Sequence, residues 1–230
     1  MKQLPRWKIW LSYLLELHVE SAESDYNPYL YVSLRRGRYQ LSTANAVYSY
    51  GDLYTNFART FARWNWEQYP IDEVLILGLG LGSIPVILAQ THHQQACQFT
   101  AVEIDEVVLD LAQRYVLNDL KNPQQMIVAD ASIAVQQLPE ENYDLLCVDI
   151  FDDDLVPEVF ETIAFLEDAK ALLRPGGVLL FNRLAANPRD EQESKAFFET
   201  TFLKVFPQGY CLDVGGNYML LSNKEAIRNV

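Results

Sequence analysis

Three acidic residues each follow a short apolar segment that has the length of a buried strand: Glu103, Asp130 and Asp149. In open α/β sheets, ligands lie at the carboxyl ends of the strands, so acids that end successive strands gather at one site. Carboxylates there can accept hydrogen bonds from hydroxyl or amino groups of a ligand. We therefore expect these three residues to form part of one binding site.

A glycine-rich segment precedes the first of these acids. Gly78, Gly80 and Gly82 directly follow an apolar run, and Glu103 lies 21 residues beyond Gly82. Glycines let the backbone turn tightly and approach a ligand, while the next helix offers free N–H groups. An acid in the position of Glu103 can accept both hydroxyls of a ribose. The spacing is GxGxG, with Ser83 where a dinucleotide fingerprint has glycine, which favours an adenosyl ligand.

The remaining strand ends extend this predicted site. Asp130 and Ala131 follow the next strand, where an acid can accept a hydrogen bond from the amino group of an adenine. Asp149 and Asp152 follow the strand after that, above the centre of the expected sheet. Asp152 also begins an acidic run at 152–154. That run can alternatively be the first turn of a helix, stabilised by the helix dipole.

The other candidates also have structural alternatives. The glycines can alternatively be ordinary turns between a strand and a helix. Glu103 and Asp130 can belong to helix N-caps, because Asp105 and Ser132 follow them at capping positions. The occurrence of glycines and acids at successive strand ends favours the nucleoside site.

Hydrophobic periodicity indicates the elements that position these residues. Apolar runs predict parallel strands over residues 74–77, 99–102, 126–128, 145–148 and 178–181. Helical stripes predict helices over residues 50–66, 82–90, 107–115, 132–137, 157–173 and 191–205. Residues 175–177 (PGG) predict a sharp stop after the fifth of these helices, and residues 209–214 and 218–221 predict a hairpin. We expect an α/β fold with a doubly wound, seven-stranded, mostly parallel sheet and antiparallel strands at its edge.

The first part of the chain has a different pattern. Residues 1–49 are expected to form a small N-terminal β segment, and residues 50–230 the main domain. Alternating apolar residues over 7–19 predict a strand. Residues 29–34 and 39–41 predict a hairpin.

Composition limits the class of protein. The 230 residues are 50% hydrophobic, so the chain can form a core. The net charge is −13, and such an acidic surface disfavours nucleic acids and anionic membranes as partners.

Glu16 and the lack of a small-residue cleavage site argue against a signal peptide, and no apolar run approaches about 18 residues. Three separated cysteines indicate reduced thiols in a cytoplasmic protein. We expect no metal site, since the adjacent His92 and His93 would diverge on any regular element.

Several of these motifs together resemble a known family. The glycine loop, the strand-end acids, residues 37–42 and residues 143–152 (YDLLCVDIFD) are similar to the spermidine synthase (polyamine aminopropyltransferase) branch of the class I S-adenosylmethionine-dependent methyltransferases. The resemblance covers about residues 29–185 and implies a Rossmann-like fold. It implies S-adenosylmethionine, its decarboxylated form or methylthioadenosine as the ligand. By this resemblance the site would contain Gly78, Gly80 and Gly82 along the sulfonium nucleoside, Glu103 at its ribose, Asp130 and Ala131 at its adenine, and Asp149 and Asp152 at the reaction centre.

The chain departs from the pattern of that branch. Leu81 stands where the branch usually has an acid beside the aminopropyl amine, and Asn45 and Ala46 stand where an acidic pair helps to hold the polyamine. Asp153 replaces a usual proline. Burying an ammonium group without its counter-charge costs several kcal/mol. We therefore expect the acceptor to differ from the usual polyamine.

The leading hypothesis is an S-adenosylmethionine-binding transferase that acts on a small amine-bearing acceptor, for which a cationic molecule is one candidate. Asp149 would orient the acceptor and take its proton, or stabilise positive charge near the sulfur. Two alternatives stay open: a true polyamine aminopropyltransferase, and a non-catalytic binding protein that keeps the fold. The resemblance also implies that the chain can form a homodimer.

Overall fold

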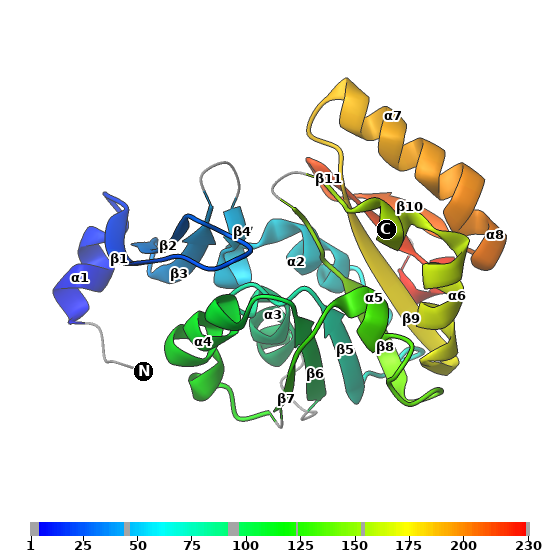
Figure 1. Cartoon of the computed structure of the whole chain (residues 1–230), viewed down its shortest axis with the longest axis horizontal. Helices are drawn as coiled ribbons and strands as arrows, with labels where there is room; N and C mark the ends of the chain where they lie inside the picture. Colours follow the sequence, from blue (N-terminus) through cyan, green and yellow to red (C-terminus); the bar gives the residue numbers. More distant parts are fainter. Residues whose placement is uncertain (1–4, 44–46, 92–96, 123, 153–154, 229–230) are drawn as a thin grey trace.

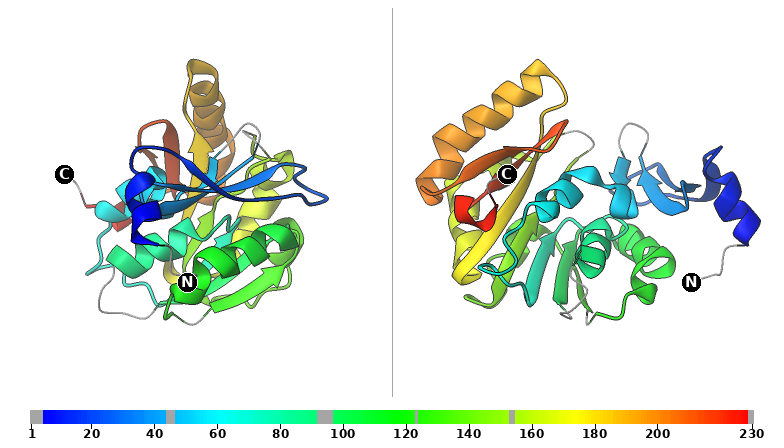
Figure 2. Two further views of the ribbon diagram at one scale, coloured as in Figure 1. Left: turned by 90° about the vertical axis from the view of Figure 1, so that its left-hand side faces the viewer. Right: turned by 180° about the vertical axis from the view of Figure 1, so that it is seen from behind.

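A computed structural model of the chain describes residues 5–43, 47–91, 97–122, 124–152 and 155–228. Figure 1 shows a small N-terminal sheet beside a larger part in which helices flank a second sheet. Seen from behind in Figure 2, the N-terminal sheet lies at the end of the molecule near α4, while the C-terminal hairpin and α7 lie at the other end.

The larger part is built on a seven-stranded sheet with the order β10-β11-β9-β8-β5-β6-β7. Its strands are β5 (Glu73–Leu77), β6 (Gln98–Glu103), β7 (Gln124–Val128), β8 (Tyr143–Val148), β9 (Leu173–Leu184), β10 (Tyr210–Asp213) and β11 (Asn217–Leu221). Strands β5 to β9 pair in parallel, whereas β11 and β10 are antiparallel to their neighbours. The predicted mostly parallel sheet with an antiparallel hairpin at its edge is confirmed.

Helices cover both faces of this sheet, so the fold is doubly wound as predicted (Figure 1). They are α2 (Thr55–Ala62), α3 (Ser83–Thr91), α4 (Glu106–Tyr115), α5 (Ala131–Ala134), α6 (Ile163–Ala171), α7 (Pro188–Phe197) and α8 (Leu203–Val205). Alternation along β5 separates two cores: Val74 and Ile76 pack with α2, α3 and α4, while Leu75 and Leu77 pack with α5 to α8.

The N-terminal part is a four-stranded antiparallel sheet preceded by a short helix. The strands are β1 (Leu17–Ala22), β2 (Leu30–Arg35), β3 (Arg38–Ser42) and β4 (Val47–Ser49), in that order, and the predicted β2–β3 hairpin is present. The predicted strand over residues 7–19 is wrong over most of its length, because α1 (Arg6–Leu11) occupies its first part and β1 begins only at Leu17. Alternation fails at Trp10 and Leu14, and Pro5 precedes a segment that buries no residue against a core.

Two further differences concern segments that follow β8. The predicted helix over 157–173 is divided into a 3₁₀ turn (Glu158–Glu161) and α6, which Thr162 caps by accepting a hydrogen bond from Phe165 N–H. The predicted stop at 175–177 instead belongs to the start of β9. Asp152 forms a bridge with Leu155 and lies outside any helical first turn.

The structure also bears on the predictions about membrane spans, metal sites and cysteines. Within the described residues, no helix combines the length and hydropathy needed to cross a membrane. No group of three or more His, Cys, Asp or Glu side chains there is arranged to hold a metal ion. His92 and His93 lie outside the described residues. All cysteines are free thiols, of which Cys97 and Cys147 are buried and Cys211 is partly exposed.

Candidate functional site

A cavity of about 790 Å³ lies at the carboxyl edge of the parallel strands. This volume is in the range typical of small-molecule and cofactor sites. The predicted site residues that line it are Gly78, Gly80, Glu103, Asp130, Ala131, Asp149 and Asp152. The fold therefore brings together residues at the carboxyl ends of four different strands.

The glycine loop joins β5 to α3, and its three glycines have positive φ angles. Gly78 and Gly80 line the cavity, but Gly82 does not. A Cβ at position 82 would lie 2.6 Å from Leu117 Cδ2, so Gly82 permits close packing behind the loop. Ser83 hydrogen-bonds through its Oγ to Ser49 Oγ at 2.6 Å, which ties the loop to the N-terminal sheet.

Glu103 holds the glycine loop in place. Its Oε2 accepts hydrogen bonds from the N–H groups of Leu79 at 3.0 Å and Gly80 at 3.3 Å, and its Oε1 accepts one from Asp105 N–H at 3.2 Å. Burial raises the pKa of Glu103, and these backbone donors oppose that shift. Glu103 is not the helix cap, because Asp105 caps α4 by accepting from Val107 N–H.

Asp130 has the capping role that its alternative interpretation predicted. Its Oδ1 accepts hydrogen bonds from the N–H of Ser132 at 2.8 Å and the Oγ–H of Ser132 at 2.7 Å, at the start of α5. Capping uses one oxygen, and no described residue donates to Oδ2. Since Asp130 also lines the cavity, this second oxygen remains able to accept a hydrogen bond from a ligand.

Asp149 lies deep in the cavity wall and is held by two donors. Its Oδ1 accepts hydrogen bonds from Tyr54 Oη–H at 3.1 Å and Asn182 Nδ2–H at 2.8 Å. Burial raises the pKa of Asp149 to about 7, the two donors lower it, and the negative charge of Glu103 raises it. Burial and the Asp149 charge also raise the pKa of Tyr54, so the phenol stays protonated and donates. A carboxyl group titrating near neutral pH can take up and release a proton.

Three neutral residues at this site were not predicted from the sequence: Tyr54, Asn182 and Asn217. Asn182 lies on β9 and accepts a hydrogen bond from Asn217 Nδ2–H at 3.0 Å. The strand-end rule that selected the acids could have selected Asn182, which directly follows the apolar run 178–181. Nothing local marks Tyr54, whose contact with Asp149 joins residues 95 positions apart.

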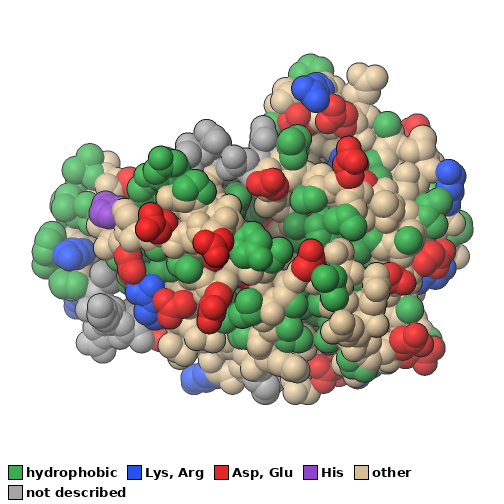
Figure 3. Space-filling model, in the orientation of Figure 1, with side chains coloured by type: hydrophobic (Ala, Val, Ile, Leu, Met, Phe, Trp, Pro, Cys, Tyr) green, Lys and Arg blue, Asp and Glu red, His purple; other side chains and the backbone are tan. Residues whose placement is uncertain are grey.

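The cavity is strongly acidic. The carboxylates in its lining are Asp25, Glu103, Asp130, Asp149, Asp152 and Asp190. No Lys, Arg or His is among the described residues that line it, and Figure 3 shows acidic side chains spread over the middle of this face of the molecule. Such a field favours a cationic ligand. Leu81 is 1% exposed and packs in the hydrophobic core instead of lining the cavity, and residues 45, 46 and 153 lie outside the described residues.

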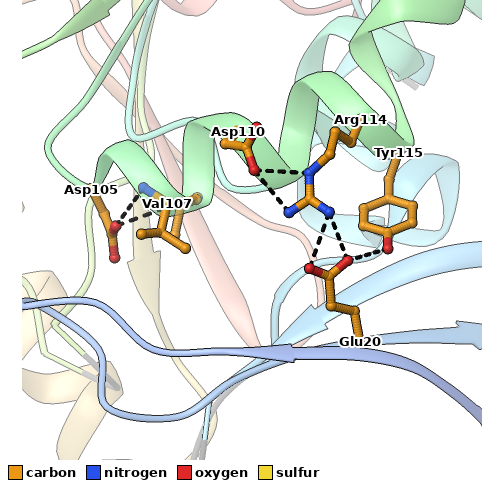
Figure 4. Close-up of polar contacts among 7 residues, drawn as sticks. Glu20, Asp105, Val107, Asp110, Arg114 and Tyr115 are labelled. Carbon is orange, nitrogen blue, oxygen red and sulfur yellow. Dashed lines mark hydrogen bonds and ion pairs between the residues drawn. The ribbon is translucent and has the colours of Figure 1, made fainter.

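Polar contacts dock the N-terminal sheet onto α4 beside this cavity (Figure 4). The Glu20 carboxylate on β1 accepts hydrogen bonds from Arg114 Nη1–H at 2.8 Å and from the Tyr115 hydroxyl. Asp105, the cap of α4, also accepts a hydrogen bond from Asn27 Nδ2–H at 3.1 Å. Asn27 and the two residues before it line the cavity, so these contacts fix one of its walls.

Comparisons with known proteins show which family the chain is similar to. The family model for the spermine/spermidine synthase domain matches residues 65–212. A polyamine aminopropyltransferase of Vibrio vulnificus (strain CMCP6) is 30% identical over 163 residues, which are 69% of this chain and 52% of that protein. An eEF1A lysine and N-terminal methyltransferase of Bos taurus is 29% identical over 119 residues, 47% of this chain and 17% of that protein. The chain thus spans about half the length of the aminopropyltransferase.

Solved structures show the same fold. The spermidine synthase from Thermotoga maritima superimposes with a TM-score of 0.66 at 15% identity, covering 89% of this chain and 72% of that one. Human methyltransferase-like protein 13 in complex with SAH superimposes with a TM-score of 0.59 at 22% identity, covering 76% of this chain and 83% of that one. With its sequence match over most of the main domain, the chain belongs to the spermine/spermidine synthase family.

Proposed function

We propose that this protein is a transferase that moves a carbon group from a sulfonium nucleoside of the adenosylmethionine type to a small amine. The observation that carries this proposal is the placement of Asp149, a carboxyl group with a pKa of about 7, on the wall of an acidic cavity that Glu103 and Asp130 also line. A site of this kind can bind a cationic donor and accept a proton from a reacting amine.

Features of the cavity wall support a nucleoside as the ligand. Gly78 and Gly80 expose backbone along one wall, and Asp130 has an oxygen to which no described residue donates. Glu103 would receive the ribose hydroxyls while still holding the loop amides, and Asp130 with Ala131 would lie at the adenine. The sulfonium group of such a ligand makes its attached carbons electrophilic.

The charges in the cavity favour the decarboxylated form of the donor. A methionine carboxylate would lie among acidic side chains, and the amides of Leu79 and Gly80 that could receive it donate to Glu103. The decarboxylated donor carries an ammonium group instead and suits this field. Aminopropyl transfer is therefore the reaction that we favour. Methyl transfer is the second candidate, supported by the 29% identity to a methyltransferase and by the core position of Leu81.

Asp149 would assist the attack of the acceptor. As the new carbon–nitrogen bond forms, the carbon–sulfur bond breaks and the nitrogen becomes more acidic. Asp149 would take the proton that this nitrogen loses, while Tyr54 and Asn182 hold the carboxylate in place. Asp152, farther along the same loop, would attract a cationic acceptor to the cavity.

The test is a comparison of donors. The protein is incubated separately with S-adenosylmethionine and with its decarboxylated form, each with a panel of amines that includes putrescine, and the products are identified by mass. An aminopropylated amine supports our proposal, whereas a methylated amine supports the second candidate. Nucleoside binding without any product would identify a non-catalytic binding protein and contradict both.

A further inference from the structure

A chain of hydrogen bonds runs from the C-terminal hairpin to Asp149. Asn217 Nδ2–H donates to Asn182 Oδ1 at 3.0 Å, and Asn182 Nδ2–H donates to Asp149 Oδ1 at 2.8 Å. The Asn182 side chain lies between the other two, and the residue is only 1% exposed. A buried amide with a partner at each end has one preferred orientation, because the opposite orientation would leave both contacts unmade.

The topology of the sheet explains how Asn217 reaches this site. Strand β11 runs antiparallel to β9, so its first residue lies at the edge where the parallel strands end. Asn217 pairs there with Leu184 at the end of β9, and the Gly215–Gly216 turn precedes it. Asn217 lines the same cavity as Asp149. It lies beyond the residues that the family model matches, which end at 212.

We propose that Asn217 is a positioning residue for Asp149, a role that rests on the function proposed above. By donating to Asn182 Oδ1, it keeps the Asn182 nitrogen turned toward Asp149, where a donor stabilises the ionised carboxylate. Without Asn217, the Asn182 amide is free to rotate and present its oxygen to Asp149. That oxygen would repel the carboxylate and favour its protonated form, which cannot take a proton from the acceptor.

Other groups also act on Asp149. Tyr54 donates to it from the start of α2, and the negative charge of Glu103, at the end of β6, raises its pKa. The Asp149 charge in turn raises the pKa of the buried Cys147 thiol on β8. These groups belong to elements other than β11. Changing Asn217 therefore acts on Asp149 through Asn182, whose side chain also interacts with Tyr54, and leaves the Glu103 charge in place.

A titration of Asp149 tests this role directly. Aspartate labelled with ¹³C at its side-chain carboxyl is incorporated, and the Asp149 signal is identified by its loss in Asp149→Asn. We expect Asn217→Ala to raise the Asp149 pKa by about 0.5 to 1. The matched control is Asn223→Ala, which removes an amide that donates to Tyr69 beyond the other end of β11. This control should leave the Asp149 pKa unchanged.

The titration does not depend on turnover, so the role of Asn217 and the proposed reaction are tested separately. If the wild type transfers no group from either donor, the proposed function fails, while the titration still shows whether Asn217 acts on Asp149. If the wild type is active, the acidic limb of the pH–rate profile should shift to higher pH in Asn217→Ala. The KM for the donor should stay unchanged.

Should Asn217→Ala fail to fold, Asn217→Ser reports the same quantity, because its shorter side chain no longer spans the contact with Asn182. An Asp149 pKa equal to that of the wild type in a folded Asn217 variant would overturn the proposal.

Discussion

The backbone of Gly78 lies directly against that of Asp149: a Cβ at position 78 would lie 2.3 Å from the Asp149 carbonyl oxygen. Gly78 is the first residue after β5 and Asp149 the first after β8, and these strands pair in parallel. The Asp149 N–H also donates to Leu77 O at 2.8 Å. The glycine loop and the proposed proton acceptor are thus fixed to each other by backbone contacts, so a change in one displaces the other.

Gly78→Ala should therefore lower the free energy of unfolding by more than the backbone cost of placing an alanine at a positive φ angle. Gly78 has a φ of +84°, which costs an alanine about 1–2 kcal/mol, and the overlap with Asp149 adds to that cost. Gly176→Ala is a matched control, since Gly176 has a φ of +87° and a Cβ there would have nothing within 4 Å. Urea unfolding of both variants measures the difference. Equal losses of stability in Gly78→Ala and Gly176→Ala would show that the contact with Asp149 imposes no constraint.

Glu103→Ala should weaken nucleoside binding by about ten- to 150-fold, or about 1.5–3 kcal/mol, the range for loss of a hydrogen-bonded charged group. Two effects contribute: the ribose loses its acceptor, and the amides of Leu79 and Gly80 lose the carboxylate that orders them. Calorimetric titration of folded protein measures the affinity. Glu106→Ala, which removes an exposed acid from the first turn of α4, serves as the control. Equal affinities of wild type and Glu103→Ala would exclude Glu103 from the site.

The sequence indicates the fold and the acids of the site for one physical reason. Buried parallel strands require continuous apolar runs, and the residues that follow such runs gather at one edge of the sheet. Glu103, Asp130 and Asp149 could therefore be placed together without a structure. The partners of Asp149 could not, because the contact with Tyr54 depends on how α2 packs over the sheet.

The wrong prediction over residues 7–19 has a related cause. Hydrophobic periodicity predicts the type of an element only when one face of that element is buried, and α1 buries none of its residues. Trp7 and Trp10 remain exposed, so the alternation of apolar residues there does not correspond to a buried face. Polar contacts hold this segment: Ser12 Oγ accepts a hydrogen bond from Gly37 N–H at 2.8 Å, and Ser12 O accepts one from Arg36 N–H at 2.8 Å. No hydrophobic pattern encodes such a contact.

Stability should depend on pH through Asp149. Its pKa is about 7 in the folded protein and near 3.8 in an unfolded chain, so the folded state binds the extra proton between these values. The contribution of Asp149 to stability is therefore fully present below pH 3.8 and is lost as the pH rises through 7. Asp149→Asn cannot ionise, so its free energy of unfolding at pH 8 should exceed that of the wild type by up to about 4 kcal/mol. Chemical denaturation at pH 4 and pH 8 measures this gain, and a gain that is the same at both values would contradict the prediction.

Asp149→Asn should also abolish most turnover while leaving nucleoside binding nearly intact. The amide keeps the shape of the carboxylate but cannot take a proton, and loss of a positioned base typically lowers rates by about 10²–10⁴-fold. In the wild type, only the ionised carboxylate is active, so turnover should rise with pH through about 7 and then level off. Single-turnover rates across pH, with donor affinity measured in parallel, separate the two effects. Full activity in Asp149→Asn would show that this residue serves the structure of the strand end and not the chemistry.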